Sequence, residues 1–413
     1  MDIWIFQTGE PLPCDPNHIR PMRAMNLAEA FAKEGHKVTI ISSTFNHQLK
    51  SQRKIKNSKF FVSKNISIHL IPSPGYQKNI GLARLMDHFI MSFNLLNYLL
   101  IIQNAPDFVF IGYPPIETAF VLSLWTRLNN VQSCLDVKDQ YPETYLRDKT
   151  RISKLIYTPF VFPYKILAKL SMRNVDFVSS ITSSFLDWIN KYSGRKPSKK
   201  DIVLPLVSTN NISKDYNNLS NYNWWKDNNI DLNKDLIITF CGTLTSIWDW
   251  SYIKDSLKIL KGRGVDITLV ICGSGSHKFD TMDLFTDLDN VKFPGWINES
   301  QLSLLMNNSL LSIAPYKNKP DFQISIPNKI IESLKYGVPI LTSLKGDVRQ
   351  LIEKNEIGYY CGEDSYLWAH YIETLVFDKL LHKSLRRNAE FLYKDSYTFD
   401  KVYGNFSRNL IIN

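Results

Sequence analysis

The sequence predicts an α/β protein built from two doubly wound, parallel-sheet domains in tandem. Three observations support this fold class. Short β-branched or aromatic runs alternate with helical patterns along the chain, an Asn-rich stretch interrupts the alternation once, and 413 residues exceed what one hydrophobic core comfortably serves. Because ligands of such sheets bind beyond the carboxyl ends of the strands, candidate site residues are expected at strand exits.

The first series of strands predicts an N-terminal domain over residues 1–207. Its strands are expected at Ile3–Phe6, Lys37–Ser42, Ile66–Ile71, Phe108–Gly112, Ser133–Val137, Phe177–Thr182 and Asp201–Leu206. The apolar segment Phe89–Ile102 is too short for a membrane span and contains two asparagines, so a buried helix is expected there.

Residues 208–235 are Asn-rich and irregular, and we interpret them as the connection between the domains. A second series of strands then predicts a C-terminal domain over residues 236–395. Its strands are expected at Leu236–Gly242, Ile267–Gly273, Val291–Trp296, Leu310–Tyr316, Val338–Thr342 and Ile357–Cys361.

The composition argues against several classes of protein. The five cysteines are odd in number and scattered, so neither a disulfide framework nor a zinc site is indicated, and a reducing cytoplasm is the expected compartment. The N-terminus carries an acid and no long apolar run, unlike a signal peptide. No stretch reaches the roughly 18 apolar residues of a membrane-spanning helix.

The net charge of +10 is concentrated in two segments of the first predicted domain. His47–Asn65 contains six Lys or Arg residues and no acidic residue. Arg147–Arg173 contains seven Lys or Arg residues and one aspartate, interspersed with Ile, Leu, Phe and Tyr. This mixture suits an anionic membrane surface, where each basic residue contributes about 1 kcal/mol, and it equally suits a solvated basic face over a core helix. No nucleic-acid module organises the charge, so nucleic acid is not an expected partner.

The segment Ser325–Leu341, "SIPNKIIESLKYGVPIL", predicts a helix with polar residues at its start. Pro327 suits the first helical turn, while Gly337 and Pro339 end the helix and lead into a strand. The polar residues at the start are Asn328, Lys329 and Glu332. Unpaired N–H groups and a partial positive charge at a helix N-terminus favour an anionic or hydroxyl-rich ligand. An ordinary capped helix is the alternative interpretation.

Glycines follow three predicted strands, at Gly9, Gly242 and Gly273. A glycine allows backbone amides to approach a phosphate closely, and the helix that follows adds its dipole. Plain turns at these positions are the alternative.

Two groups of charged residues lie at strand exits or helix starts of the first predicted domain. Arg20 and Arg23 head an amphipathic helix, where their guanidinium groups suit an anion or pair with surface acids. Asp136, Asp139 and Glu143 follow a predicted strand. One of these carboxylates could orient an acceptor hydroxyl, and a structural helix cap is the equal alternative.

Four segments together resemble a known family. They are "TGEPLP…RPMRAMNLAEAFAKEGHKVTIISS" near the N-terminus, "LDVKDQYPE", "SIPNKIIESLKYGVPIL" and "GDVRQLIEKNEIGYY". With the two-domain plan, they resemble the family four glycosyltransferases of GT-B fold. More narrowly, they are similar to enzymes that assemble bacterial O-antigen and capsule, including transferases of N-acetylated amino sugars.

The resemblance implies two Rossmann-like domains facing across a cleft, with a nucleotide sugar on the second and the acceptor on the first. It also implies that residues 396–413 return to the first domain. Asp139, Lys329 and Glu332 are the catalytic candidates. The donor-binding candidates are Gly9, Gly242, Thr243, Gly273, Ser325, Ile326, Asn328, Lys329 and Glu332. Arg20, Arg23 and Asp139 are the candidates for acceptor or phosphate binding.

The family's helix motif contains two glutamates, of which the first meets the sugar and the second the ribose. Glu332 matches the second, Ile324 stands in place of the first, and Asp321 is three residues out of register. A carboxylate facing a sugar without the matching hydroxyls would lack partners, so a deoxy or N-acetylated donor sugar is expected.

The expected activity is sugar transfer from a UDP-sugar with retention of configuration. The acceptor is expected to be a lipid-linked sugar or an oligosaccharide of O-antigen or capsule synthesis, at the inner face of the cytoplasmic membrane. No cofactor or metal is expected, and Asp287 and Asp289 of "DLD" are interpreted as turn residues. The alternatives are a sugar-nucleotide epimerase of the same fold, for which only His277 lies near a donor-side loop, and a non-catalytic partner subunit.

Overall fold

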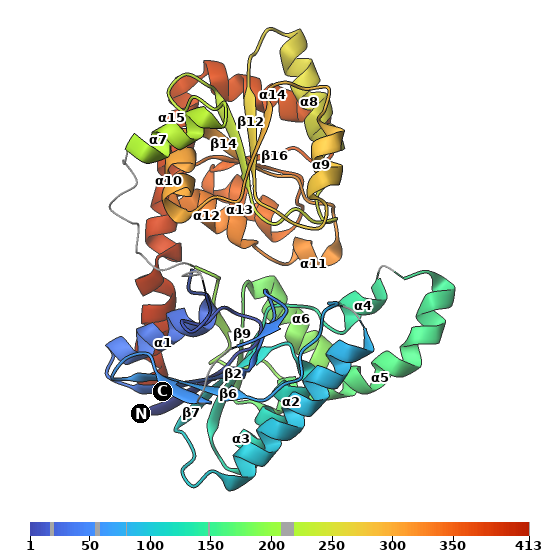
Figure 1. Ribbon diagram of the computed structural model, residues 1–413, viewed down its shortest axis with the longest axis vertical. Helices are drawn as coiled ribbons and strands as arrows, with labels where there is room; N and C mark the ends of the chain where they lie inside the picture. Colours follow the sequence, from blue (N-terminus) through green and yellow to red (C-terminus); the bar gives the residue numbers. More distant parts are fainter. Residues whose placement is uncertain (17–19, 54–57, 80, 148, 208–218, 413) are drawn as a thin grey trace. The chain divides into compact units, whose positions relative to one another are not determined.

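The computed structural model describes residues 1–16, 20–53, 58–79, 81–147, 149–207 and 219–412. The chain divides into two compact units (Figure 1). The first contains Met1–Thr209 and Phe399–Asn413, and the second contains Asn210–Thr398. Each unit is built on its own largely parallel sheet, so the two-domain, Rossmann-like α/β class predicted from the sequence is confirmed.

The first unit contains an eight-stranded sheet in the order β10-β9-β8-β7-β1-β2-β6-β5. Its strands are β1 (Asp2–Phe6), β2 (Lys37–Ser43), β5 (Lys59–Phe61), β6 (Ile66–Ile71), β7 (Phe108–Tyr113), β8 (Gln132–Val137), β9 (Phe177–Ser180) and β10 (Ile202–Val203). Neighbouring strands are parallel except β5, which pairs antiparallel with β6. All six residues of β7 are buried, as expected for a central strand covered by helices.

Helices and a small hairpin complete the first unit. The helices are α1 (Arg23–Lys33), α2 (Leu82–Ile101), α3 (Ile116–Leu128), α4 (Glu143–Arg147), α5 (Arg151–Asn174), α6 (Ser183–Ser193) and α16 (Asn405–Ile412). The π-helical segment η2 (Asp400–Gly404) leads into α16, and β3 (Phe45–Asn46) pairs with β4 (Ser51–Gln52).

The second unit contains a six-stranded, fully parallel sheet in the order β13-β12-β11-β14-β15-β16. Its strands are β11 (Ile237–Cys241), β12 (Thr268–Cys272), β13 (Val291–Gly295), β14 (Ser309–Ala314), β15 (Ile340–Thr342) and β16 (Gly358–Tyr360). Its helices are α7 (Leu219–Asp227), α8 (Ser251–Gly262), α9 (Lys278–Leu284), α10 (Glu299–Asn308), α11 (Pro320–Gln323), α12 (Asn328–Lys335), α13 (Asp347–Asn355), α14 (Ser365–Phe377), α15 (Lys379–Leu392) and the π-helical η1 (Tyr393–Tyr397).

All thirteen predicted strands are present, with ends that shift by a few residues. The sequence did not predict β3, β4 or β5. Each of these has two or three residues, and β4 and β5 are mostly exposed, so no long apolar alternation marks them.

Helix α2 differs from the buried helix expected at Phe89–Ile102. Its inward residues are Asp87, His88, Met91, Ser92, Leu95 and Leu99, while Phe89, Phe93, Leu100 and Ile101 are between 58% and 78% exposed. The expectation of full burial was wrong because α2 has apolar residues on both faces and only one face meets the unit. Across the described part of the chain, no helix combines the length and apolarity needed to cross a membrane.

Part of the predicted connection belongs to the core of the second unit. Residues 208–218 lie outside the described residues. Beyond them, α7 places the fully buried Trp225 against Ile237, Val270 and Leu305. The Asn-rich composition hid this helix, because two neighbouring tryptophans and few other apolar residues give a weak periodic pattern.

The C-terminal residues 399–412 pack on the first unit. The ring of Phe406 lies 5.8 Å from that of Phe31 on α1 and 6.0 Å from that of Phe110 on β7. The buried Tyr403 hydroxyl contacts the backbone of Val207. The last helix therefore covers the sheet of the first unit beside α1.

We expect Trp225→Ala to lower the free energy of unfolding of the second unit by about 3–5 kcal/mol, because the change removes a fully buried indole and leaves a cavity. Trp296→Ala is the matched control, since its indole is 74% exposed, and a change within about 0.5 kcal/mol is expected. Urea unfolding followed by circular dichroism measures both. Equal stability of the two variants would contradict the place of α7 in this core.

Candidate functional site

The ammonium of Lys329 lies at the carboxyl edge of the second sheet. Lys329 is in the first turn of α12, and its Nζ donates a hydrogen bond to the carbonyl oxygen of Cys241 at the end of β11. The same Nζ is 3.8 Å from the ring centroid of Phe240 and 5.1 Å from that of Trp248. Loss of hydration lowers the pKa of Lys329 to about 8, and the nearby Glu332 opposes this shift. The group therefore stays mainly cationic at neutral pH, held by aromatic rings and a carbonyl.

Glu332 lies one helical turn after Lys329 and is partly buried. Both side chains, with Cys241 and Ser333, line a small cavity of about 10 Å³. A cavity of this size holds about one water molecule, so it is not itself a sugar-binding site. The Ser333 hydroxyl lies 2.7 Å from that of Ser312 on β14, which fixes α12 against the sheet.

The glycines after β11 and β12 permit close packing. A Cβ at Gly242 would lie 2.6 Å from Lys329 Nζ, and one at Gly273 would lie 1.9 Å from the Gly242 carbonyl oxygen. Their own N–H groups, however, donate to the carbonyls of Cys272 and Gly295, at 3.0 and 2.7 Å. These two amides therefore bond within the unit, and the glycines make room for the lysine and for each other, while their part in donor binding stays a prediction.

The other donor-binding candidates of the second unit differ in exposure. Thr243 is exposed, and its carbonyl accepts a hydrogen bond of 2.8 Å from Trp248 Nε1. Asn328 is exposed, Ile326 is partly exposed, and Ser325 is buried with its hydroxyl 3.4 Å from the carbonyl of Phe322. Ile324 ends the short helix α11, to which Asp321 belongs.

The two aspartates of "DLD" are bound by lysines. Asp287 lies 2.7 Å from Lys254 and 2.8 Å from Lys258, and Asp289 lies 3.0 Å from Lys261. Hydrogen bonds from these lysines lower the pKa of both carboxyl groups. Among the described residues, no group of three or more His, Cys, Asp or Glu is arranged to hold a metal ion.

The first unit has a pocket of about 280 Å³ at the carboxyl edge of its sheet, which we call the polar pocket. Its lining includes two of the predicted candidates, Gly9 and the exposed Asp139. Residues that the sequence did not single out also line it, namely Glu10, His47, Tyr76, Arg84, His88 and Lys138. A lone His or Arg outside any motif gives no signal in one sequence, because only folding brings these positions together.

Cations and a neutral histidine surround one tyrosine in the polar pocket. The Tyr76 hydroxyl lies 2.5 Å from His47 Nδ1, and its ring lies 4.6 Å from Lys50 Nζ and 5.6 Å from Arg84 Cζ. Burial, reinforced by Lys50 and Arg84, lowers the pKa of His47 to about 4, so this imidazole is neutral at physiological pH. Nearby, the buried Asp87 carboxylate accepts hydrogen bonds from Ser73 and Gly75.

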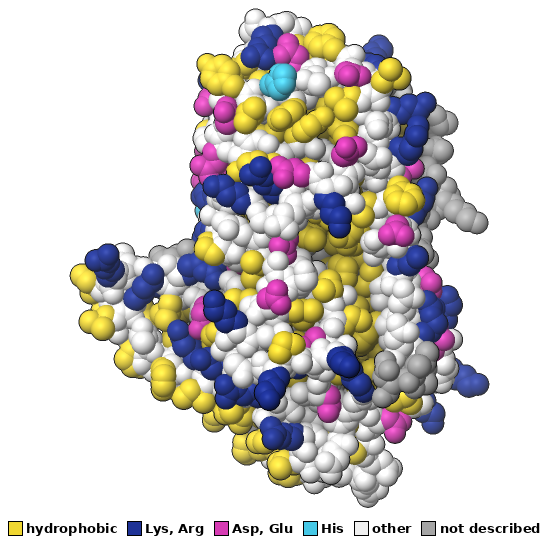
Figure 2. Space-filling model, turned by 180° about the vertical axis from the view of Figure 1, so that it is seen from behind, with side chains coloured by type: hydrophobic (Ala, Val, Ile, Leu, Met, Phe, Trp, Pro, Cys, Tyr) yellow, Lys and Arg dark blue, Asp and Glu magenta, His cyan; other side chains and the backbone are white. Residues whose placement is uncertain are grey.

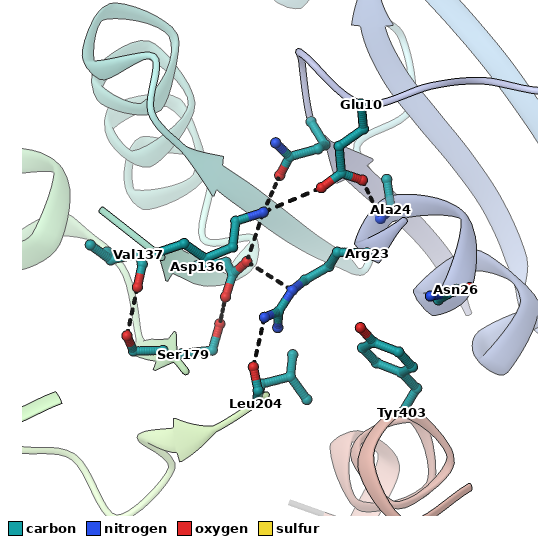
Figure 3. Close-up of polar contacts among 12 residues, drawn as sticks. Glu10, Arg23, Ala24, Asn26, Asp136, Val137, Ser179, Leu204 and Tyr403 are labelled. Carbon is teal, nitrogen blue, oxygen red and sulfur yellow. Dashed lines mark hydrogen bonds and ion pairs between the residues drawn. The ribbon is translucent and has the colours of Figure 1, made fainter. Parts of the chain in front are cut away.

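Arg23 is not one of the residues lining the polar pocket, and its buried side chain points toward Asp136 and Leu204 (Figure 3). Its Nε lies 3.4 Å from Asp136 Oδ2, and its Nη2 donates to the Leu204 carbonyl at 2.6 Å. Asp136 also accepts from the Ser179 hydroxyl at 2.8 Å and lies 3.7 Å from Lys138. Both Arg23 and Asp136 are about fully buried, so the expectation that Arg23 meets an anionic ligand does not fit, and the arginine ties α1 to β8.

The remaining candidates of this region lie nearer the surface. Arg20 is exposed just before α1. Glu143 starts α4 and forms an ion pair with Lys165 of α5 at 3.2 Å. Lys138 lies 3.3 Å from Glu10 and reaches the lining of the polar pocket.

Residues 224–391, within the second unit, match the family described as glycosyl transferases group 1. The second unit therefore contains a glycosyltransferase domain of this family, and the chain has the GT-B fold. No curated protein matches this glycosyltransferase significantly in sequence.

Solved structures share the fold of the glycosyltransferase along its whole length. Sucrose-phosphate synthase from Thermosynechococcus elongatus has a TM-score of 0.70 at 14% identity, covering 100% of this chain and 99% of that one. Anabaena HepE in complex with UDP-glucose has a TM-score of 0.66 at 14% identity, covering 100% of both chains. WaaG, a glycosyltransferase involved in lipopolysaccharide biosynthesis, has a TM-score of 0.66 at 14% identity, covering 99% of both. At such identity the likeness shows the fold alone.

We expect Arg23→Gln to lower the free energy of unfolding by about 3–5 kcal/mol, because it removes the buried cation that pairs with Asp136 and leaves only Lys138, at 3.7 Å, beside this carboxylate. Arg127→Gln is the control, because this exposed arginine of the same unit donates a hydrogen bond of 3.0 Å to Asn174 at the surface, and the change should alter stability by about 0.5 kcal/mol or less. Denaturant unfolding compares the two. A stable Arg23→Gln protein would return Arg23 to the list of ligand-binding candidates.

Proposed function

We propose that this glycosyltransferase moves a hexose from a UDP-sugar, bound by the second unit, to a hydroxyl group of an acceptor bound by the first. The observation that carries the proposal is the Lys329 ammonium, held at the carboxyl edge of the second sheet. Negative charge grows on the departing diphosphate during glycosyl transfer, and a fixed cation at a helix start stabilises it. That HepE has been solved in complex with UDP-glucose supports a UDP-sugar as the donor.

Within the donor site, we propose that Glu332 accepts hydrogen bonds from the ribose hydroxyls. Its position one turn along α12 from Lys329 would place ribose and diphosphate on neighbouring groups of the same helix. Ile324 stands where the family has its sugar-facing glutamate, which supports a deoxy or N-acetylated donor sugar.

We propose a retaining reaction that uses no metal. The carboxylates of Asp287 and Asp289 form ion pairs with Lys254, Lys258 and Lys261. The Asp-x-Asp pair that the sequence offered as a metal site therefore already has cationic partners. Lys329 and the start of α12 would stabilise the leaving group instead.

For the acceptor we propose the polar pocket of the first unit, with Asp139 orienting the hydroxyl that reacts. The acceptor would be a lipid-linked sugar or an oligosaccharide of bacterial O-antigen or capsule synthesis. WaaG, which shares the fold, is described as involved in lipopolysaccharide biosynthesis, and this supports the assignment. The enzyme would act in the cytoplasm, peripherally at the inner face of the membrane.

Exposed apolar side chains beside basic ones support the peripheral contact (Figure 2). On α5, Ile152, Leu155 and Phe160 are 75%, 79% and 72% exposed, and the helix also carries Lys154 and Lys169. Such a surface is suited to an anionic bilayer, where lysines meet head groups and aromatic edges enter the interface. The proposal also includes the basic segment 50–64, except residues 54–57, which lie outside the residues that the structure describes.

Incubation with radiolabelled nucleotide sugars tests the activity. Transfer of label should require both a UDP-sugar and an acceptor, and should persist in EDTA. Conversion of the nucleotide sugar without acceptor would identify an epimerase instead, and the absence of both reactions would favour a non-catalytic subunit. Activity that EDTA abolishes and Mn²⁺ restores would overturn the metal-independent mechanism.

We expect Glu332→Gln to weaken UDP binding at least about tenfold, because a neutral amide accepts the ribose hydroxyls less strongly than a carboxylate. Glu299→Gln at the start of α10 is the control, as its side chain is 40% exposed and pairs with Lys335 at 3.8 Å. Isothermal titration calorimetry with UDP and GDP measures both. Unchanged affinity of the Glu332 variant would remove this residue from the donor site.

Sedimentation with phosphatidylglycerol vesicles tests the membrane contact. Binding should weaken steeply as salt rises, since charge attraction is screened over about 8 Å at physiological ionic strength. Changing Arg151, Lys154, Lys165 and Lys169 to Ser should reduce it further. A control with the same charge change replaces Lys226, Lys234, Lys354 and Lys394 of the second unit. If the two variants sediment equally with the vesicles, α5 is a solvated basic face and not a membrane contact.

A further inference from the structure

Two free thiols lie side by side at the carboxyl edge of the second sheet. Cys241 ends β11, Cys272 ends β12, and the two residues are direct partners in the parallel register of these strands. Side chains of register partners on neighbouring strands share one face of the sheet. Cys272 belongs to the apolar cluster around Trp225, Cys241 packs against that cluster, and the two thiols form a hydrogen bond.

The two thiols differ in reactivity. The hydrogen bond with Cys272 lowers the pKa of the Cys241 thiol, and the Lys329 ammonium adds to this shift, whereas burial raises the pKa of Cys272. The thiolate is the nucleophilic form of cysteine, so Cys241 is the thiol that reacts first. Burial raises the thiol pKa of the other three cysteines, Cys14, Cys134 and Cys361.

A reagent reaches Cys241 before Cys272. Cys241 is partly exposed and lines the small cavity that also contains the side chains of Lys329 and Glu332. Cys272 is 1% exposed. The cavity holds about one water molecule, so a reagent that enters it must be small. A reactive thiol beside a buried second thiol is the arrangement in which oxidation of the first is followed by a disulfide with the second.

The ends of β11 and β12 suit a disulfide. Neighbouring strands lie about 4.7–4.9 Å apart, within the range of about 4.4–6.8 Å between the Cα atoms of a disulfide. Gly242 and Gly273 follow the two cysteines, and a Cβ at Gly273 would lie 1.9 Å from the Gly242 carbonyl oxygen. The absence of side chains at these glycines lets the two strand ends approach each other.

The backbone of Cys241 also holds the cation of the proposed donor site. Lys329 Nζ donates a hydrogen bond to the Cys241 carbonyl oxygen, and a Cβ at the next residue, Gly242, would lie 2.6 Å from this Nζ. A covalent bond at the Cys241 sulfur would move this backbone and displace the acceptor that fixes the ammonium. Oxidation of the two thiols would therefore change the position of Lys329.

We propose that Cys241 and Cys272 form a reversible oxidation site for peroxide, and that the disulfide weakens nucleotide binding at the donor site. The Cys241 thiolate attacks one oxygen of hydrogen peroxide, the O–O bond breaks, and a sulfenic acid and hydroxide form. The hydroxide takes up the proton that the Cys241 thiol lost. The Cys272 sulfur then attacks the sulfenic sulfur, and its proton leaves with the displaced hydroxyl as water. In total two thiols and one peroxide give one disulfide and two waters.

The effect on nucleotide binding rests on the proposed function, because it requires that Lys329 meets the diphosphate of the donor. The formation of the disulfide does not, since it depends only on the two thiols and the oxidant. The two parts of the proposal are therefore measured separately.

The first measurement finds the disulfide in the full-length wild-type chain. The protein is treated with hydrogen peroxide, its remaining thiols are alkylated, and a non-reduced digest is analysed by mass spectrometry. A linked peptide pair containing Cys241 and Cys272 should appear, and dithiothreitol should remove it. Failure to find this pair, or a link between other cysteines instead, would overturn the proposal.

The second measurement is calorimetry with UDP on the reduced and the oxidised chain. Oxidation should weaken UDP binding at least about fivefold, and dithiothreitol should restore the affinity. A linked pair with unchanged UDP affinity would disprove the coupling to the donor site. If the reduced chain binds neither UDP nor GDP, the proposed donor is wrong, and the linked peptides alone decide whether the oxidation site exists.

Variants separate the disulfide from other oxidation. Cys272→Ser should give no linked pair, and peroxide should change its UDP affinity by less than about twofold. Cys361→Ser is the matched control, because it removes a thiol that is also 1% exposed in the same unit, and it should respond to peroxide as the wild type does. An equal loss of UDP affinity in Cys272→Ser and the wild type would show that the disulfide is not the cause. Circular dichroism confirms that each variant is folded, and the wild-type digest needs no variant.

Discussion

In a parallel sheet covered by helices, both faces of each central strand are buried in apolar contacts, and polar side chains gather where the strands end. In both units this edge collects the charged residues that the proposed chemistry uses. β7 is buried throughout, and the acids and cations of the first unit appear after β1 and β8. In the second unit the ends of β11 and β12 are so close that a Cβ at Gly273 would overlap the Gly242 carbonyl, and the Lys329 ammonium lies beside Gly242.

Arg23 and Lys329 show how the groups around a cationic side chain decide whether it is available to a ligand. Arg23 is balanced by the buried Asp136 carboxylate and a backbone carbonyl, so its charge is neutralised inside the protein. Lys329 instead meets aromatic rings and a single carbonyl, and loss of hydration lowers its pKa to about 8. A negative group near Lys329, such as a diphosphate, would replace the favourable interactions with water that the ammonium loses on burial.

The first unit combines polar and apolar binding features in one region. Arg84 connects a pocket with a neutral histidine, His47, to a groove walled by aromatic side chains of α5. Apolar residues on the outward face of α2 extend this surface. Covering this region would remove exposed Phe and Leu side chains from water, which is favourable.

The sequence by itself determined the class of the fold, the parallel strands and the residues around α12. Strand runs and the Pro327 and Gly337 signals act locally, so they can be read without the tertiary structure. Sequence reasoning placed Arg23 toward a ligand and α2 in the core, because it cannot tell which partner a charge meets or which apolar face is covered. Only the tertiary structure decided those points, and it alone brought Arg84, His47 and Tyr76 together, since these residues are distant along the chain and belong to no local pattern.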